Sequence, residues 1–172
     1  RILPGPSSIW LDATGRRLPP PNFPGFDTLG SLQAITGAGH GHSWFVLNRR
    51  IAEREIALSG SEQNPDLTGR SFRGVLGRAR AGVPGPVQAF LDNGADFVVA
   101  DDLAELVAGM NRLTEQPLLD PLLVAEQVVA RDRQLENPFG KDAQVAAIRD
   151  ARRYRGDRLV RTLKPHRILD PA

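Results

Sequence analysis

Apolar and polar positions along this chain follow two periods, which predict several helices and a few short strands. The clearest helix begins after Asp102, and Glu105 three residues later completes the spacing of a capping box. Its apolar positions fall on one face, namely Leu103, Leu106, Val107 and Met110. The preceding run, Asp96–Ala100, is short and apolar. The pattern therefore predicts a strand that leads into a helix.

Further helices are predicted from their start and stop signals. Asp120 is a favourable N-cap, and Pro121 suits the first helical position of a helix that runs to about Leu135. The remaining predicted helices are Arg49–Leu58 with Gly60 as cap, Phe72–Arg80, Pro86–Asn93 ending at Gly94, and Asp142–Tyr154. The polar stretch Glu62–Arg70 is predicted to be a loop.

Proline and glycine punctuate the opening segment, residues 1–42, so it cannot be mostly helical. Within it, Ile9–Leu11 predicts a short strand, Asp12–Gly15 a turn in which glycine is free to take positive φ, and Arg16–Leu18 the return of a hairpin. A second run, Trp44–Leu47, is aromatic and β-branched, which favours a buried strand that ends at Asn48.

These elements do not alternate as β-α-β units, which argues against a doubly wound sheet. We expect an α+β fold with a small, mainly antiparallel sheet and several helices. The length of 172 residues predicts a single domain, residues 1–172. Because the chain begins at Arg1 and has no clear terminator after its basic end, we expect it to be a segment of a longer protein.

Composition narrows the class of protein. The absence of cysteine excludes a disulfide scaffold and a thiolate site, and we expect a cytoplasmic location. No apolar run reaches the roughly 20 residues that a membrane-spanning helix needs. A net charge of only +2 and 6% aromatic residues argue against nucleic acid as a partner.

Glycines and histidines suggest chemistry that their context does not support. The loop Gly37–Gly41 lacks the preceding strand of a phosphate-binding turn. The glycine series at Gly74, Gly77 and Gly82 lacks the Gly-Lys-Ser/Thr ending of a phosphate-binding loop. His40 and His42 lie two residues apart with no carboxylate cluster nearby, so we predict exposed loop histidines and no metal site.

The strongest charge feature is a basic cluster over residues 149–167. It contains Arg149, Arg152, Arg153, Arg155, Arg158, Arg161, Lys164 and Arg167 against Asp150 and Asp157. Three interpretations stay open, namely a solvated or salt-bridged face, a site that contacts an anion, substrate or flavin, and a nucleic-acid site. Tyr154, the only tyrosine, lies inside this cluster, where neighbouring cations would favour proton transfer by its phenol; a core or cap aromatic is the alternative.

Several segments resemble, in the same order, the capping domain of the fumarate reductase and 3-ketosteroid dehydrogenase family of flavoproteins. The hairpin Ile9–Leu18 resembles the segment that opens this domain, and Ser43–Asn48 its central strand. Ala100–Leu106 and Gln127–Asp142 resemble two of its helices. The chain also resembles sequences called FAD-binding dehydrogenases, in the segments Glu62–Arg70 and Tyr154–Arg158.

The resemblance implies an FAD-dependent dehydrogenase that acts on a CH–CH group, with this chain as its substrate cap. FAD would be bound mainly by segments absent here, so the implied partners are the flavin-binding domain of the same polypeptide and a small hydrophobic, ketosteroid-like substrate. The fumarate reductases carry an arginine proton donor where this chain has Pro20–Asp27, which places fumarate reduction in doubt.

Six residues are the candidates for the site. Tyr154 is assigned to proton transfer, Arg155 and Arg158 to polarising a carbonyl or holding the flavin, and Phe23, Phe26 and Trp44 to substrate packing. The alternative function is a stand-alone binding or interaction module that uses the basic C-terminal face.

Overall fold

The computed structural model describes residues 2–3, 5–24, 26–58, 82–83, 85–151 and 165–169. In chain order the elements are β1 (Ile2–Leu3), β2 (Ile9–Asp12), α1 (Thr28–Gly37), β3 (Ser43–Val46), α2 (Arg49–Glu55), β4 (Ala57–Leu58), α5 (Gly85–Asn93), α6 (Leu103–Arg112), α7 (Pro121–Glu136) and α8 (Ala143–Ala151). The strands form two antiparallel pairs, β1 with β4 and β2 with β3. The fold is therefore α+β, as predicted from the sequence.

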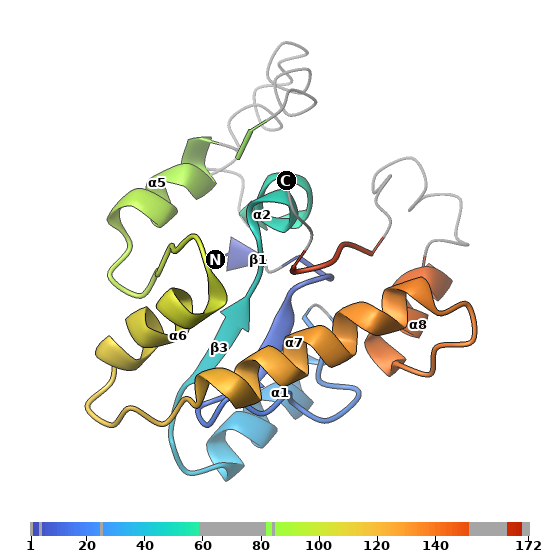
Figure 1. Ribbon diagram of the computed structural model, residues 1–172, viewed down its shortest axis with the longest axis horizontal. Coiled ribbons are helices and arrows are strands. Elements are labelled where there is room, and N and C mark those ends of the chain that lie inside the picture. The colour runs from blue at the N-terminus through green and yellow to red at the C-terminus, as the bar shows by residue number, and fades with distance from the viewer. Residues whose placement is uncertain are drawn as a thin grey trace.

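The pair β2–β3 is the centre of the fold, and α7 lies across it (Figure 1). Ile9 pairs with Val46 and Leu11 with Trp44, so these four side chains share one face of the ribbon. That face packs against Val124 and Val128 of α7 and against Val107 and Met110 of α6. Because these residues alternate along strands and recur at helical spacing, the core follows directly from the sequence pattern.

The predicted hairpin forms, although its second arm is reduced to one bridge between Leu11 and Arg17. Gly15 has φ of +87° in the turn, as expected for a residue without a side chain. The main partner of β2 is β3. Strand β2 ends at Asp12, and β3 begins 31 positions later, at Ser43. The strand predicted at Trp44–Leu47 is confirmed one residue earlier, but Phe45 is 40% exposed and stacks on Trp10.

Aspartate caps define the helix starts that the sequence predicted. The carboxylate of Asp102 accepts a hydrogen bond from the N–H of Glu105 at 2.8 Å, and Asp120 accepts one from Leu122 at 2.9 Å. Asp142 does the same for Val145 at 2.9 Å, so α8 begins where predicted. The helix predicted at Pro86–Asn93 is confirmed as α5 and ends before Gly94.

Two predicted elements are wrong in the described residues. The helix from Arg49 ends at Glu55 because the next residue is extended and Ala57–Leu58 pair with β1. Residues 96–100 are not a strand; they lie along α6, where Val98 Cγ1 occupies the space that a Cβ on Gly109 would need. Packing of Val98 against this glycine replaces the strand pairing that the apolar run predicted.

Helix α1 was not predicted, because glycine and proline surround it. Asp27 starts it by accepting a hydrogen bond from the N–H of Gly30 at 2.8 Å. Its Leu29 and Leu32 are 67% and 56% exposed, so no buried stripe marked it as a helix. The predicted loop Glu62–Arg70 and helix Phe72–Arg80 lie outside the described residues. No helix in the described ranges has the length and apolar character to cross a membrane.

Candidate functional site

Of the six residues proposed from the sequence, the structure describes Phe23, Phe26 and Trp44. Tyr154, Arg155 and Arg158 lie outside the described residues. Phe23 and Phe26 contact each other edge to face, with ring centroids 5.5 Å apart. Phe23 is buried and Phe26 is 46% exposed, so this pair presents one aromatic ring at the surface from a well-packed base.

Trp44 occupies a different environment from the two phenylalanines. Its ring packs at the edge of the core and meets the His42 ring edge to face at 5.4 Å, and no ring contact in the described residues joins it to Phe23 or Phe26. Its indole N–H is buried and has no hydrogen-bond partner there. His42 and His40 lie beside β3, and a ring nitrogen of His42 is 3.0 Å from the carbonyl of His40.

A buried polar network connects the incoming segment, residues 5–8, with the outgoing segment, residues 165–169. Arg131 of α7 is at its centre and is 1% exposed. Its Nη2 donates to the carbonyl of Ser7 at 2.7 Å, and its Nη1 donates to the carbonyl of His166 at 2.5 Å and to Asp132 at 2.9 Å. One guanidinium therefore holds both segments.

Asp132 also binds the outgoing segment. Its carboxylate accepts hydrogen bonds from the backbone N–H groups of Ile168 and Leu169, each at 2.9 Å, and its side chain is 2% exposed. The amide of Asn48 donates to the carbonyls of Arg167 and Ile168 at 3.0 and 3.1 Å. Because buried charges are costly unless paired and hydrogen-bonded, this arrangement specifies one position for the outgoing segment.

Glu55 and Gln144 extend the network around the incoming segment. Glu55 accepts a hydrogen bond from the N–H of Ser7 at 2.7 Å and lies 2.6 Å from a ring nitrogen of His166. Gln144 donates to the carbonyls of Pro6 and Ser8 at 2.6 and 2.8 Å. The N–H of His166 donates directly to the Ser7 hydroxyl at 2.9 Å. The two segments thus run side by side, as the dark red segment in Figure 1 shows.

Burial and charge pull the pKa of Arg131 in opposite directions. Desolvation lowers the pKa, the hydrogen bond and charge of Asp132 raise it, and the net direction is downward. An arginine begins so far above neutrality that it stays protonated here. The pair consequently acts as a fixed ionic joint rather than a proton donor.

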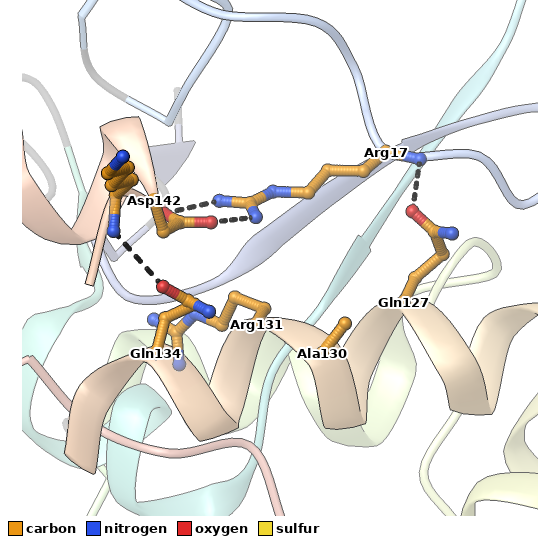
Figure 2. A pocket seen from close by; sticks show the side chains of 7 residues that line it. Arg17, Gln127, Ala130, Arg131, Gln134 and Asp142 are labelled. Atoms are coloured by element: carbon orange, nitrogen blue, oxygen red, sulfur yellow. Dashed lines mark hydrogen bonds and ion pairs between the residues drawn. The ribbon is translucent and has the colours of Figure 1, made fainter. Parts of the chain in front are cut away.

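A pocket of about 320 Å³ opens beside this network, between α7 and the hairpin (Figure 2). It is lined by Arg17, Gln127, Ala130, Arg131, Gln134, Lys141 and Asp142. Arg17 reaches across it to Asp142 with both terminal nitrogens and to Gln144 at 2.6 Å. Burial alone would raise the pKa of Asp142, but hydrogen bonds from Arg17 and from the N–H of Val145, with the Arg17 charge, hold that pKa below its ordinary value.

Part of the basic cluster at residues 149–167 has a structural partner. Arg149 donates to the carbonyl of Leu135 at 2.9 Å, and Arg167 forms an ion pair with Glu136, both at the C-terminal end of α7. Cations at this end of a helix bind its free carbonyls and complement its dipole. The salt-bridged interpretation therefore holds for Arg167, whereas Arg149 is held by helix carbonyls. The other basic residues of the cluster, Arg152, Arg153, Arg155, Arg158, Arg161 and Lys164, lie outside the described residues.

The network of Arg131 and Asp132 was missed from the sequence. A signal was present, since these residues follow Val124 and Val128 at helical spacing and therefore lie on the buried face of α7. Charged residues on a face that is otherwise apolar indicate partners elsewhere in the fold. Those partners are backbone carbonyls and N–H groups over 30 residues away, and no residue-type pattern reveals them.

Comparison with known proteins finds one family model and several relatives that share one name. The family model described as FAD binding domain matches residues 1–165. The chain is 62% and 61% identical to KsdD-like steroid dehydrogenases of two Mycobacterium tuberculosis strains, CDC 1551 and H37Rv, over 172 residues. It is 57% identical to a KsdD-like steroid dehydrogenase of Mycolicibacterium smegmatis over 171 residues.

Each alignment covers 99% of this chain but only 30% or 31% of the relative. The chain thus spans less than a third of the length of the curated relatives it matches. No solved structure matches the chain significantly.

Proposed function

The chain belongs to the FAD-binding family of flavoproteins that includes the 3-ketosteroid dehydrogenases and fumarate reductases, and from this premise we propose that it is the substrate cap of an FAD-dependent dehydrogenase. The reaction is removal of hydrogen from a CH–CH group of a cyclic, ketosteroid-like ketone. The relatives named as steroid dehydrogenases support the substrate class.

One observation carries the capping role, namely that residues 5–8 and 165–169 lie side by side. A domain inserted into a host must leave and rejoin it at neighbouring points, and inserted domains have their two connections close together. Here the N–H of His166 donates to the Ser7 hydroxyl at 2.9 Å, and Arg131 binds a carbonyl in each segment. This chain covers only 30% of the relative's length, which supports a longer polypeptide that contains further domains.

FAD is the cofactor of this family, and its binding falls to the rest of the polypeptide. A dinucleotide binds at the turn of a parallel β-α-β unit, whereas both strand pairs in the described residues are antiparallel. The described residues therefore do not fit as the dinucleotide cradle. When bound, FAD supplies the acceptor for hydride.

The residues of this chain contribute water exclusion, substrate contacts and a group that accepts the proton lost by the substrate. Phe26 offers an exposed ring braced by Phe23, a surface suited to an apolar ring system. Tyr154, in the basic cluster, accepts the proton that the substrate loses, while Arg155 and Arg158 polarise the substrate carbonyl or hold the flavin. Closure of the cap excludes water from the reaction.

The test uses the full-length protein and its flavin. We expect a yellow protein whose flavin is reduced by a 3-ketosteroid, and Tyr154→Phe to lower kcat by about a hundredfold or more while the flavin spectrum stays unchanged. Arg149→Gln is the matched control, because Arg149 already bonds helix carbonyls and should change kcat little.

Unchanged turnover in Tyr154→Phe would remove this residue from the mechanism. A colourless full-length protein would favour instead a binding module that uses the basic C-terminal face. Retention of flavin with no response to any ketosteroid would overturn the substrate class alone.

A further inference from the structure

The pocket between α7 and the hairpin has an uneven distribution of hydrogen-bonding groups. Each of its side-chain acceptors already takes a bond: Gln127 Oε1 from the N–H of Arg17 at 3.4 Å, Gln134 Oε1 from the N–H of Lys141 at 3.2 Å, and both oxygens of Asp142 from Arg17. Figure 2 shows these bonds around the opening. Each side-chain acceptor of the pocket therefore already has at least one donor within the protein.

The donor groups of the same side chains have no acceptor among the described residues. No described residue accepts from the amide nitrogens of Gln127 and Gln134 or from the ammonium of Lys141. The two terminal nitrogens of Arg17 donate to Asp142 and Gln144, and its Nε has no acceptor among the described residues. The Nε of Arg131, which is 1% exposed, is buried without a partner. Gln127 and Gln134 are half-buried and Lys141 is exposed, so their donors are accessible to a ligand that accepts hydrogen bonds.

The charges of the pocket lining also favour an occupant with negatively charged oxygen atoms. Arg17, Arg131 and Lys141 line the pocket against the single carboxylate of Asp142. Asp132 offsets Arg131 from within the buried network, which leaves the positive charge of Lys141 without a partner among the described residues. A volume of about 320 Å³ is enough for a small molecule or ion with part of its hydration shell.

We propose that this pocket is a binding site for a small oxyanion, a phosphate or carboxylate group held by Lys141, Gln127 and Gln134. Hydrogen bonds from amide and ammonium donors to an ionised oxygen are stronger than those between neutral groups. The Arg17–Asp142 pair forms the rigid wall of the site, and Lys141 supplies the charge. This site is separate from the exposed Phe26 ring and does not depend on the capping function.

Binding is measured by isothermal titration calorimetry on the full-length flavoprotein, with sodium phosphate and sodium malonate against sodium chloride at equal ionic strength. We expect saturable binding of phosphate or malonate with a dissociation constant in the millimolar range or tighter. Lys141→Gln should weaken it by at least about tenfold, and Gln134→Leu should weaken it as well. The stronger of the two anions identifies the chemical class.

Arg133→Gln is the matched control, because it removes a cation from α7, the helix that carries Gln127 and Gln134, at a residue outside the pocket lining. Its affinity should equal that of the unchanged protein. The proposal is overturned if neither anion binds above the chloride control, or if Arg133→Gln weakens binding as much as Lys141→Gln does. An unchanged flavin spectrum and melting temperature establish that each variant is folded.

Discussion

At the scale of single residues, Gly15 shows how the hairpin turn depends on one backbone conformation. Its φ is +87°, and a Cβ there would lie 3.0 Å from Val124 and 3.3 Å from Leu119. Both the left-handed conformation and the packing against α7 therefore disfavour a side chain. The sequence predicted the positive φ from the turn, but not the contact with a helix over a hundred residues away.

Gly15→Ala should lower the free energy of unfolding by about 1–2 kcal/mol, the usual cost of a left-handed conformation for an L-residue. Denaturant unfolding measures the change. Gly37→Ala is the matched control, because it ends α1 with nothing within 4 Å of the added Cβ, and it should be neutral or slightly stabilising. Equal effects of the two substitutions would contradict this explanation.

Asp142 gives a pH dependence of defined sign. Its pKa is lowered in the folded state, so the folded protein favours the ionised form, and the stabilisation is complete above the ordinary carboxyl value near pH 4. It is lost as the pH falls from about 4 through the lowered pKa.

Asp142→Asn should therefore destabilise the protein at neutral pH and flatten the loss of stability below about pH 4. Unfolding midpoints measured from pH 7 to pH 2 test this. Asp101→Asn, at an exposed carboxylate before α6, should leave the acid limb of the curve unchanged. An acid limb as steep in Asp142→Asn as in the parent would rule out this role.

At the scale of elements, the sequence predicted helices best where an aspartate cap precedes an apolar stripe. Helices α6 and α7 began as predicted because Asp102 and Asp120 are local signals that need no tertiary contact. The end of α2 was wrong because Ala57–Leu58 pair with β1, more than 50 residues away. The apolar run at residues 96–100 does not form the predicted strand, because Val98 packs against Gly109 of α6.

The cap of α6 can be tested in the intact protein. Asp102→Ala removes the acceptor for the N–H of Glu105, bonded at 2.8 Å, and should cost about 1 kcal/mol of helix stability. Amide hydrogen exchange should speed up at the start of α6. Asp101→Ala, at the preceding residue, should leave exchange there nearly unchanged, and a similar acceleration in both variants would argue against a specific cap.

At the scale of the whole molecule, the sequence predicted the α+β class but not the network that holds residues 5–8 beside residues 165–169. Helical spacing from Val124 and Val128 placed Arg131 and Asp132 on a buried face, yet their partners are backbone atoms of residues 5–8 and 165–169. Residue types carry no record of which distant carbonyl a guanidinium meets. The candidates Phe23, Phe26 and Trp44 stay predictions, since no described contact with a substrate tests them.

Arg131→Met should destabilise this part of the protein by about 3–5 kcal/mol, because it leaves Asp132 buried without its cation and frees both connecting segments. Thermal unfolding and exchange of the amides of Ile168 and Leu169 measure this. Arg133→Met, on the same helix with an exposed side chain, is the control and should change stability little. Loss confined to α7, with the amides of residues 168 and 169 still protected, would contradict the role of Arg131.

The closeness of residues 5–8 and 165–169 also bears on how such proteins diversify. When a stretch of chain leaves and returns at one point, it can be lengthened, shortened or exchanged without moving the strands on which it is mounted. Under the capping proposal, another domain with two adjacent connections could take the place of this one on the same flavin-binding domain. Each such domain would need its own bonds between its two connections, as Arg131 provides here.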